Sequence, residues 1–234
     1  KYLDSGNEAR IKKAYESRDP RLQMAVITPY AQYNGASSGI AHTYTLRWPY
    51  RGSDSAEPFD IRTDTNDKFY YLWRKFVPEG LEQTERDTYG LDIPLIHYAE
   101  VLLLKAEALN EWGSTHESEA IRCVNEVRRR AGHVELNNAT YPATKVNGQS
   151  DLRERIRNEY YWEIGGEDSM YFHELRWGTW KDKKFDNNRN GLMQMWGETT
   201  YTWYWLGDQC WSWPIPAKEM EMNSNLEQNE GWIN

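Results

Sequence analysis

The fold of this chain is decided by residues 93–132, which read IPLIHYAEVLLLKAEALNEWGSTHESEAIRCVNEVRRRAG. In the first half, residues that stand three or four positions apart share one helix face, namely Ile96, Ala99, Leu103, Ala106 and Asn110. A second apolar series follows at Ala120, Val124, Val127 and Ala131. Between them, Gly113 supplies the left-handed residue that commonly ends a helix. The stretch therefore predicts two amphipathic helices joined by a short turn, a helical hairpin.

Small residues recur at seven-residue steps through this hairpin, at Ala99, Ala106, Gly113 and Ala120. The pattern resembles a tetratricopeptide repeat, a helix-turn-helix unit of about 34 residues. One such repeat leaves its own apolar faces uncovered, and about three are needed for a stable stack. We therefore expect a mainly α-helical fold built on tetratricopeptide-like hairpins, in which residues 93–132 are scaffold.

The composition is that of a globular protein and excludes several classes of function. The chain carries 36 acidic and 28 basic residues, a net charge of −8. This argues against binding to nucleic acid, which requires clustered Lys and Arg. No run of about 18 apolar residues is present, so the sequence predicts no membrane span. Cys123 and Cys210 lack metal-ligand spacing; two free thiols are the simpler interpretation, and a single bridge between them remains open.

Shorter elements are expected before the hairpin. Residues 1–22 read as a helix closed by a turn at residues 19–22, where a proline pushes the preceding residue out of helical geometry. Residues 24–27 have the length of a strand. Residues 28–67 read as a long irregular connection rich in Gly, Ser, Asp and Pro, and residues 68–77 read as extended.

After the hairpin, a further helix is expected from Leu152, with Asp151 as its N-cap and Gly165–Gly166 as its end. Its apolar stripe is Leu152, Ile156, Tyr160 and Ile164. Arg155 and Glu159 stand one turn apart and are expected to pair. Residues 195–234 read as an aromatic β hairpin, formed by residues 201–206 and the segment around Trp211, and a turn-rich tail.

The candidate ligand site lies in the aromatic region of residues 28–76. The chain has twelve Trp and sixteen Tyr but only five Phe, so most of its aromatic rings carry a polar group. A sugar ring has an apolar C–H face and a rim of hydroxyls, which suits aromatic faces beside planar hydrogen-bonding groups. We expect Trp48, Tyr44 and Tyr50 to stack on a glycan and Arg51 and Asp54 to bind its hydroxyls. The alternative is that these rings only pin the loop to the body of the protein.

Several motifs occur in a recognisable order along the chain. They are DPRL at residues 19–22, AEVLL at 99–103, NEVRRRAG at 125–132 and WPIP at 213–216, followed by Asn223, Asn225 and Gly231–Trp232. Together they resemble the SusD/RagB family, the surface nutrient-binding lipoproteins of Bacteroidetes. Glu159, Glu163, Glu167, Arg176 and Trp177 also match that family's pattern, whereas Asp168, Met170 and His173 depart from it.

The resemblance implies a helical body with irregular loops and a small β element. It implies a protein without cofactor, metal or catalytic centre that binds an oligosaccharide at the cell surface. It also implies docking on a SusC-like, TonB-dependent transporter of the outer membrane, with attachment to the membrane only through a lipid anchor outside this chain. Family members are about twice as long, so residues 1–234 are expected to be a C-terminal half whose N-terminal repeats are missing.

Two other functions compete with this interpretation. A tetratricopeptide-type adaptor would recognise a peptide or another protein. A glycoside hydrolase needs two carboxylates, and Glu159, Glu163 and Glu167 stand close together in the sequence. Because one helical turn or a Gly-Gly break separates them, we expect these carboxylates to pair instead with Arg153, Arg155 and Arg157. His97 is expected on a helix surface, and Arg128–Arg130 are expected to form a solvated helix end.

Overall fold

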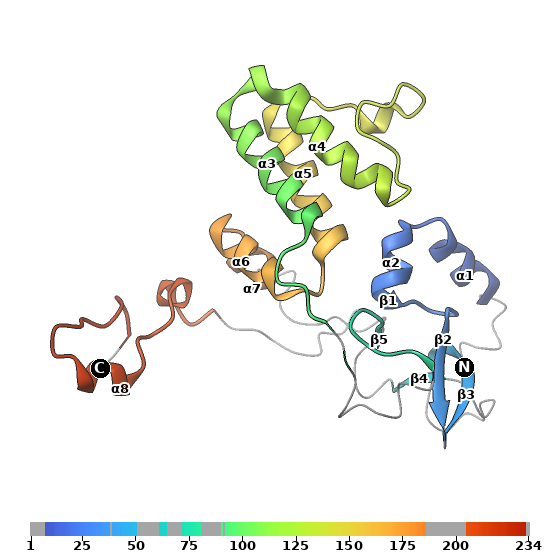
Figure 1. Ribbon diagram of the computed structural model, residues 1–234, viewed down its shortest axis with the longest axis horizontal. Coiled ribbons are helices and arrows are strands. Elements are labelled where there is room, and N and C mark those ends of the chain that lie inside the picture. Colours follow the sequence, from blue (N-terminus) through green and yellow to red (C-terminus); the bar gives the residue numbers. More distant parts are fainter. Residues whose placement is uncertain are drawn as a thin grey trace. The chain divides into compact units, whose positions relative to one another are not determined.

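The structure, a computed structural model, describes residues 8–37, 39–50, 61–64, 72–80, 90, 92–185 and 205–232. The chain divides into two compact units, residues 1–170 and 171–234, and each is described by itself. The expected mainly α-helical class is confirmed, since all the long elements except one strand hairpin are helices within the described ranges (Figure 1).

The predicted helical hairpin is present at the centre of the first unit. Helix α3 spans Tyr98–Trp112 and helix α4 spans Glu117–Arg130, with a 3-10 turn, η3, at Ser114–His116 between them. Gly113 has φ = +136°, a backbone conformation that residues with a Cβ rarely adopt. The helix therefore ends where the sequence predicts, because only glycine relieves the strain of that turn.

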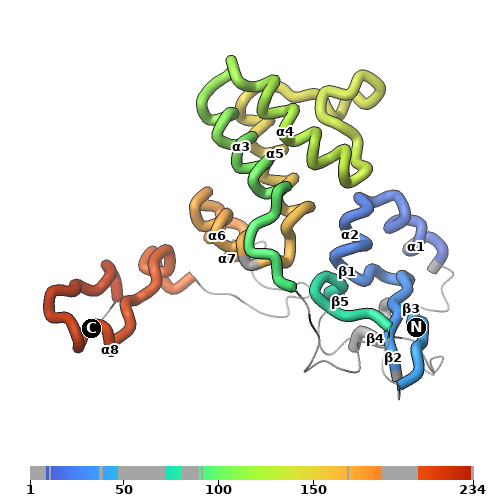
Figure 2. Tube along the Cα trace, viewed as in Figure 1, coloured from blue at the N-terminus to red at the C-terminus, as the bar shows by residue number. Residues whose placement is uncertain are grey.

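Helix α5, Gln149–Ile164, lies beside α3 and α4 and completes a three-helix core (Figures 1 and 2). The predicted apolar stripe of α5 is confirmed as buried at Leu152, Ile156, Tyr160 and Ile164. It packs with Leu103, Ala106 and Leu109 of α3 and with Ala120, Val124 and Val127 of α4, all buried. The predicted N-cap is wrong by three residues: Gly148 is the cap, and Asp151 instead accepts the Asn147 N–H at 2.8 Å. A 3-10 turn, η4 at Pro142–Thr144, precedes α5.

The N-terminal part of the first unit contains two short helices, α1 at Glu8–Glu16 and α2 at Pro20–Ala25. The expected turn at residues 19–22 is therefore wrong, since these residues open a helix. Proline at the first helical position loses no hydrogen bond, and its ring fixes a helical φ. Asp19 precedes it as the N-cap.

The expected irregular connection at residues 28–67 is wrong at residues 32–37, 40–50 and 61–64, which form strands, whereas residues 28–31 are irregular as expected. Strands β2 (Gln32–Ser37) and β3 (Ile40–Tyr50) form an antiparallel hairpin, and β4 (Ile61–Asp64) runs parallel to β3. Strands β1 (Val26–Ile27) and β5 (Leu72–Trp73) form a separate antiparallel pair. Ile27, Tyr33 and Leu46 make a small buried core between these elements, which gives the strands a face to cover.

The second unit contains most of helix α6 (Asp168–Arg176), helix α7 (Trp180–Phe185), the 3-10 turn η5 (Asp208–Trp211) and helix α8 (Ala217–Met222). The expected strand around Trp211 is wrong, because residues 208–211 are helical. Of its predicted partner at residues 201–206, residues 201–204 lie outside the described residues and residues 205–206 are not in a strand. Edge-to-face contacts join Tyr171 to Trp180 and Trp205 to Trp211, with ring centres 4.8 and 5.1 Å apart.

The tail of the second unit folds back on the WPIP motif. The Gln228 side chain accepts the Ile215 N–H at 2.7 Å and donates to the Ile215 carbonyl at 2.9 Å. The Trp232 indole N–H donates to the Ser212 carbonyl at 2.8 Å. Side chains of the tail thus satisfy backbone groups in and next to the WPIP motif.

Candidate functional site

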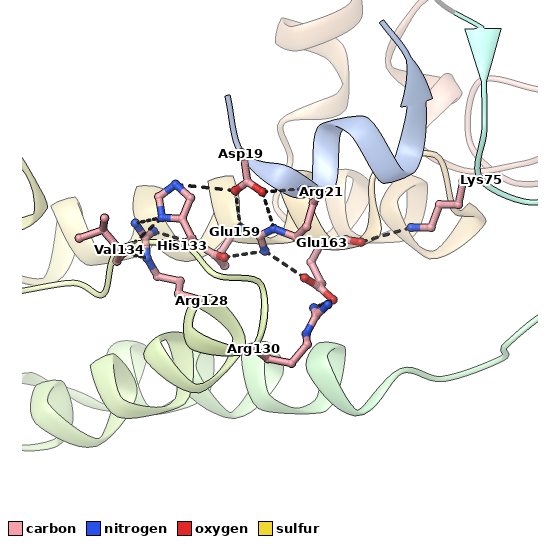
Figure 3. A network of polar contacts seen from close by, with 9 residues as sticks. All are labelled: Asp19, Arg21, Lys75, Arg128, Arg130, His133, Val134, Glu159 and Glu163. Atoms are coloured by element: carbon pink, nitrogen blue, oxygen red, sulfur yellow. Dashed lines mark hydrogen bonds and ion pairs between the residues drawn. The ribbon is translucent and has the colours of Figure 1, made fainter. Parts of the chain in front are cut away.

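The DPRL motif attaches helix α2 to helix α5 through a network of charged contacts (Figure 3). Asp19 caps α2 by accepting the backbone N–H of Arg21 at 2.9 Å. A second Asp19 oxygen accepts from the Arg21 guanidinium at 2.7 Å. The carboxylate therefore satisfies a free N–H at the start of the helix and orients the arginine at the same time.

Glu159 is the centre of this network and is completely buried. Its two oxygens lie 2.8 Å from Arg21 Nη1 and 2.9 Å from Arg128 Nη1. The expected pair between Arg155 and Glu159 is wrong, because Glu159 lies on the buried face of α5 whereas Arg155 binds Asp151 at 3.0 Å. A buried carboxylate requires such partners, since an unpaired charge in the interior is costly.

Glu163, one turn further along α5, also binds two arginines. Its Oε2 lies 2.9 Å from Arg21 Nη1, and its other oxygen pairs with Arg130. The predicted pairing of Glu159 and Glu163 with Arg153, Arg155 and Arg157 is therefore wrong. Those arginines bind other acids, in the pairs Arg153–Glu111, Arg155–Asp151 and Arg157–Glu154.

Glu167 follows the end of α5 and joins two further segments to it. It forms an ion pair with Lys75, which also donates to the Glu163 carbonyl at 3.2 Å. His97 Nε2 lies 2.9 Å from the other Glu167 oxygen. His97 is therefore half-buried in a polar contact, and its expected position on an open helix surface is wrong.

Trp162 covers one side of the network. The guanidinium carbons of Arg21 and Arg128 lie 6.0 and 5.8 Å from the centre of its ring, and the His133 ring stacks on it at 5.5 Å. Arg128 is thus buried, so the prediction of a solvated helix end at Arg128–Arg130 is wrong for this residue. Arg129 and Arg130 are exposed.

Burial and ion pairing oppose each other in this network. Burial would raise the pKa of the Asp19 carboxyl, but the hydrogen bonds and charge of Arg21 outweigh it and hold the pKa below its usual range. Burial lowers the pKa of the Arg128 guanidinium, against the attraction of Glu159. For Arg21, the effect of burial is outweighed by Asp19, Glu159 and Glu163, which raise its pKa. Asp19 and Arg21 are therefore both charged at neutral pH.

A cavity of about 480 Å³ lies between α1, α2 and the strand hairpin. Its lining includes two tyrosines and several hydrogen-bonding side chains, namely Tyr15, Tyr30, Gln23, Gln32, Thr45 and Arg74. Arg74 is oriented by Glu79, whose Oε2 accepts from Arg74 Nη2 at 3.1 Å. Aromatic rings beside amides and a fixed guanidinium can bind a ligand that has both an apolar face and hydroxyl groups. We call this space the tyrosine cavity.

Tyr30 has a strained backbone at the edge of the tyrosine cavity. Its φ is +64°, and its N–H donates to the Leu46 carbonyl at 2.7 Å. The Ala31 N–H closes the turn on the Thr28 carbonyl at 2.9 Å. A non-glycine residue in this region costs energy and persists only where the surroundings hold it, as they often do at binding sites.

The structure describes only part of the predicted glycan site. Tyr44 lies in β3, half-buried against the small core of Ile27, Tyr33 and Leu46, while its neighbour Thr45 lines the tyrosine cavity. Trp48 and Tyr50 belong to the same strand, but their side chains lie outside the described residues, as do Arg51 and Asp54 entirely. Their predicted role stays a prediction.

Three lining residues of the tyrosine cavity were not predicted from the sequence, namely Tyr15, Gln23 and Arg74. They come from helix α1, helix α2 and the turn after β5, three segments that only the fold brings together. Tyr30 was within the predicted aromatic region, but its positive φ had no signal in the sequence, since Pro29–Tyr30 is compatible with ordinary turns.

Three further observations concern metal binding, the cysteines and membrane spans. In the part of the chain that the structure describes, no three His, Cys, Asp or Glu side chains gather closely enough to hold a metal ion. Cys123 is buried, Cys210 is half-buried, and both are free thiols. Among the described helices, none has the length and apolarity needed to cross a membrane.

The profile of the SusD family matches residues 3–232. This chain belongs to the SusD family. It is 32% identical over 139 residues to a SusD-like protein of Formosa agariphila, a match that covers 59% of this chain and 24% of the relative. It is 28% identical over 161 residues to the starch-binding protein SusD of Bacteroides thetaiotaomicron, covering 68% of this chain and 25% of that protein.

Solved structures of SusD-like proteins share the fold. A SusD-like protein from Bacteroides fragilis aligns with a TM-score of 0.62 at 22% identity, over 94% of this chain and 40% of that one. A SusD homologue from Bacteroides thetaiotaomicron aligns with a TM-score of 0.55 at 20% identity, over 96% of this chain and 43% of that one. The matches thus cover about a quarter of the two relatives and 40% and 43% of the two solved chains.

Proposed function

We propose that this chain is part of a non-catalytic protein that binds oligosaccharides at the surface of the outer membrane and delivers them to a SusC-like, TonB-dependent transporter. The observation that carries the proposal is the tyrosine cavity, in which Tyr15 and Tyr30 lie beside amide, hydroxyl and guanidinium groups. Membership of a family that includes a starch-binding protein supports the same class of ligand.

The proposed site extends from the tyrosine cavity along strand β3. We retain Trp48, Tyr44 and Tyr50 as stacking residues and Arg51 and Asp54 as partners for hydroxyl groups. Thr45 of the same strand lines the cavity, which supports this proposal. Tyr44 also packs against the core, so it is a poor choice for a binding test, because its removal would destabilise the strands.

Ion pairing of Glu159, Glu163 and Glu167 supports binding without catalysis. Glycoside hydrolysis needs one carboxyl group that can donate a proton and a second that acts as base or nucleophile. Glu159 and Glu163 each contact two arginines and Glu167 contacts Lys75, so these carboxylates are already engaged by cationic side chains of the protein. Incubation of the full-length protein with an oligosaccharide should therefore release no shorter product on chromatography.

Calorimetry of the full-length protein with maltoheptaose, cellohexaose and xylohexaose tests the binding proposal. We expect at least one of these to bind, and Tyr30→Ala and Trp48→Ala to weaken it about tenfold or more, because each removes a stacking surface. Trp112→Ala is the control, since Trp112 is exposed on α3 and does not line the cavity.

Three results would contradict parts of this proposal. Unchanged affinity in Tyr30→Ala and Trp48→Ala would exclude these residues as the stacking surface. Binding of a peptide, with no binding of any oligosaccharide, would favour the adaptor function instead. Failure of the full-length protein to copurify with a TonB-dependent transporter from solubilised outer membranes would argue against the delivery step.

A further inference from the structure

A second cavity, of about 360 Å³, lies where α2, the turn after β5 and the end of α5 meet. It shares no lining residue with the tyrosine cavity, although neighbouring residues line the two: Gln23 and Arg74 line the tyrosine cavity, and Met24 and Lys75 line the second. Helix α2 and the segment after β5 therefore form a wall between them. We call the second space the Trp162 cavity, and its volume is in the range of small-molecule sites.

Trp162 is both exposed and fixed in orientation. It keeps 43% of its surface exposed, and Met24 beside the cavity keeps 73%. Yet the Trp162 ring is held by His133, stacked with an interplanar angle of 23°, and by the guanidinium groups of Arg21 and Arg128. An aromatic surface that is already ordered loses little conformational entropy when a ligand stacks on it.

The polar groups around Trp162 are ordered as well. Glu163 is held by Arg21 and Arg130, and Glu167 is held by Lys75 and His97. Arg130 remains 58% exposed although it pairs with Glu163, so its guanidinium has donors left for a ligand. Acids and bases are nearly balanced among these groups, which favours a neutral ligand with several hydroxyls over a charged one.

We propose that the Trp162 cavity is a second carbohydrate subsite, in which a pyranose ring stacks on Trp162 and its hydroxyls bind Arg130 and the Glu163 and Glu167 carboxylates. The subsite rests on the proposed glycan-binding function and adds to it a second contact surface across the wall formed by α2. The ordered aromatic face supplies the stacking surface, and the paired charges supply donors and acceptors in fixed positions.

Fluorine NMR of the full-length protein labelled with 5-fluorotryptophan tests the subsite directly. The Trp162 signal is assigned by its loss in Trp162→Phe, a variant that keeps an aromatic ring in the network. Maltotriose, cellotriose and xylotriose are the probes. We expect at least one probe to shift the Trp162 signal. The same probe should also shift this signal in the Tyr30→Ala variant, because that substitution impairs the tyrosine cavity alone.

Calorimetry with the same probes separates the possible outcomes. Trp162→Ala should weaken binding about tenfold, whereas Trp112→Ala should not change it. A probe that binds by calorimetry but leaves the Trp162 signal in place would overturn the subsite and leave the proposed function intact. If none of these oligosaccharides binds by either method, the proposed function falls and the subsite falls with it.

Discussion

Neutralising Glu159 should be one of the most damaging single changes to the first unit. Glu159 has no exposed surface and contacts two guanidinium groups, at 2.8 and 2.9 Å. The side chains of Arg21 and Arg128 are only 9% and 6% exposed. In Glu159→Gln both arginines keep their charges in a largely buried position but lose the carboxylate between them.

The size of the effect follows from this burial. Removing one partner of a buried ion pair typically costs about 3–5 kcal/mol, because the remaining charge is uncompensated. Arg21 keeps the carboxylates of Asp19 and Glu163 as partners, whereas the partners left to Arg128 are the Val134 carbonyl and the His133 and Trp162 rings. Arg128 therefore accounts for most of the loss. Glu154→Gln is the matched control, since this α5 carboxylate is 60% exposed and its pair with Arg157 is worth at most about 1 kcal/mol.

Urea denaturation of the full-length protein, followed by tryptophan fluorescence, measures the difference. With a slope of about 3 kcal/mol/M, a loss of 3–5 kcal/mol lowers the midpoint by about 1–2 M, whereas the control should shift it by about 0.3 M or less. Equal shifts in Glu159→Gln and Glu154→Gln would refute the reasoning, because they would mean that the buried pairs contribute no more than an exposed one.

Other predictions test the core, the network and one turn. Leu103→Ala removes a fully buried side chain between the helices and should lower the free energy of unfolding by about 2–5 kcal/mol, measured by the same denaturation. Because the pKa of Asp19 is lowered in the folded protein, its carboxylate adds stability at pH values above the ordinary carboxyl pKa, and this stability is lost as the pH falls through the folded pKa. Asp19→Asn should therefore flatten the decline in melting temperature below about pH 4. Gly166→Ala should destabilise more than Gly132→Ala: both glycines have positive φ, but only at Gly166 would a new Cβ meet the Trp73 ring, at 2.6 Å. Equal melting temperatures for the two alanine variants would contradict this reasoning.

The helical core was predictable because its pattern is local. The buried residues of α3, α4 and α5 recur every three or four positions, so the sequence alone identified the hairpin and the stripe of α5. The ends were less certain, since Gly148 rather than the better capping residue Asp151 precedes α5. Capping preference is worth about 1 kcal/mol, and packing of a helix face easily outweighs it.

The strands and the ion pairs were not predictable from local pattern. Strand β2 has the sequence QYNGAS, whose residues mostly disfavour strands, and it forms because β3 pairs with it over its whole length. Spacing along a helix is visible in a sequence, and it predicts Arg155, one turn away, as the partner of Glu159. Arg21 comes from a helix far away in the chain, and such a contact depends on the tertiary fold.

The candidate ligand site shows the same limit of prediction from sequence, here for a single residue. The aromatic ring of Tyr44 predicts a stacking residue, but the sequence does not reveal that Tyr44 also packs partly against the core, or that its neighbour Thr45 lines the tyrosine cavity. In a strand, neighbouring side chains point to opposite faces, so the register decides which of them a ligand can reach.

The contact between Arg21 and Glu163 joins residues 142 positions apart and sets an order of folding events. Closing so long a loop costs conformational entropy that is regained only once both ends are structured, whereas α3 and α4 meet across a turn of a few residues. We therefore expect the α3–α4 hairpin to form first and α2 to dock on α5 late. Substitutions at Arg21 should then accelerate unfolding and leave the folding rate nearly unchanged. The contacts of the DPRL motif would then be the last to form in the first unit, and its ion pairs would determine the rate at which the native state unfolds.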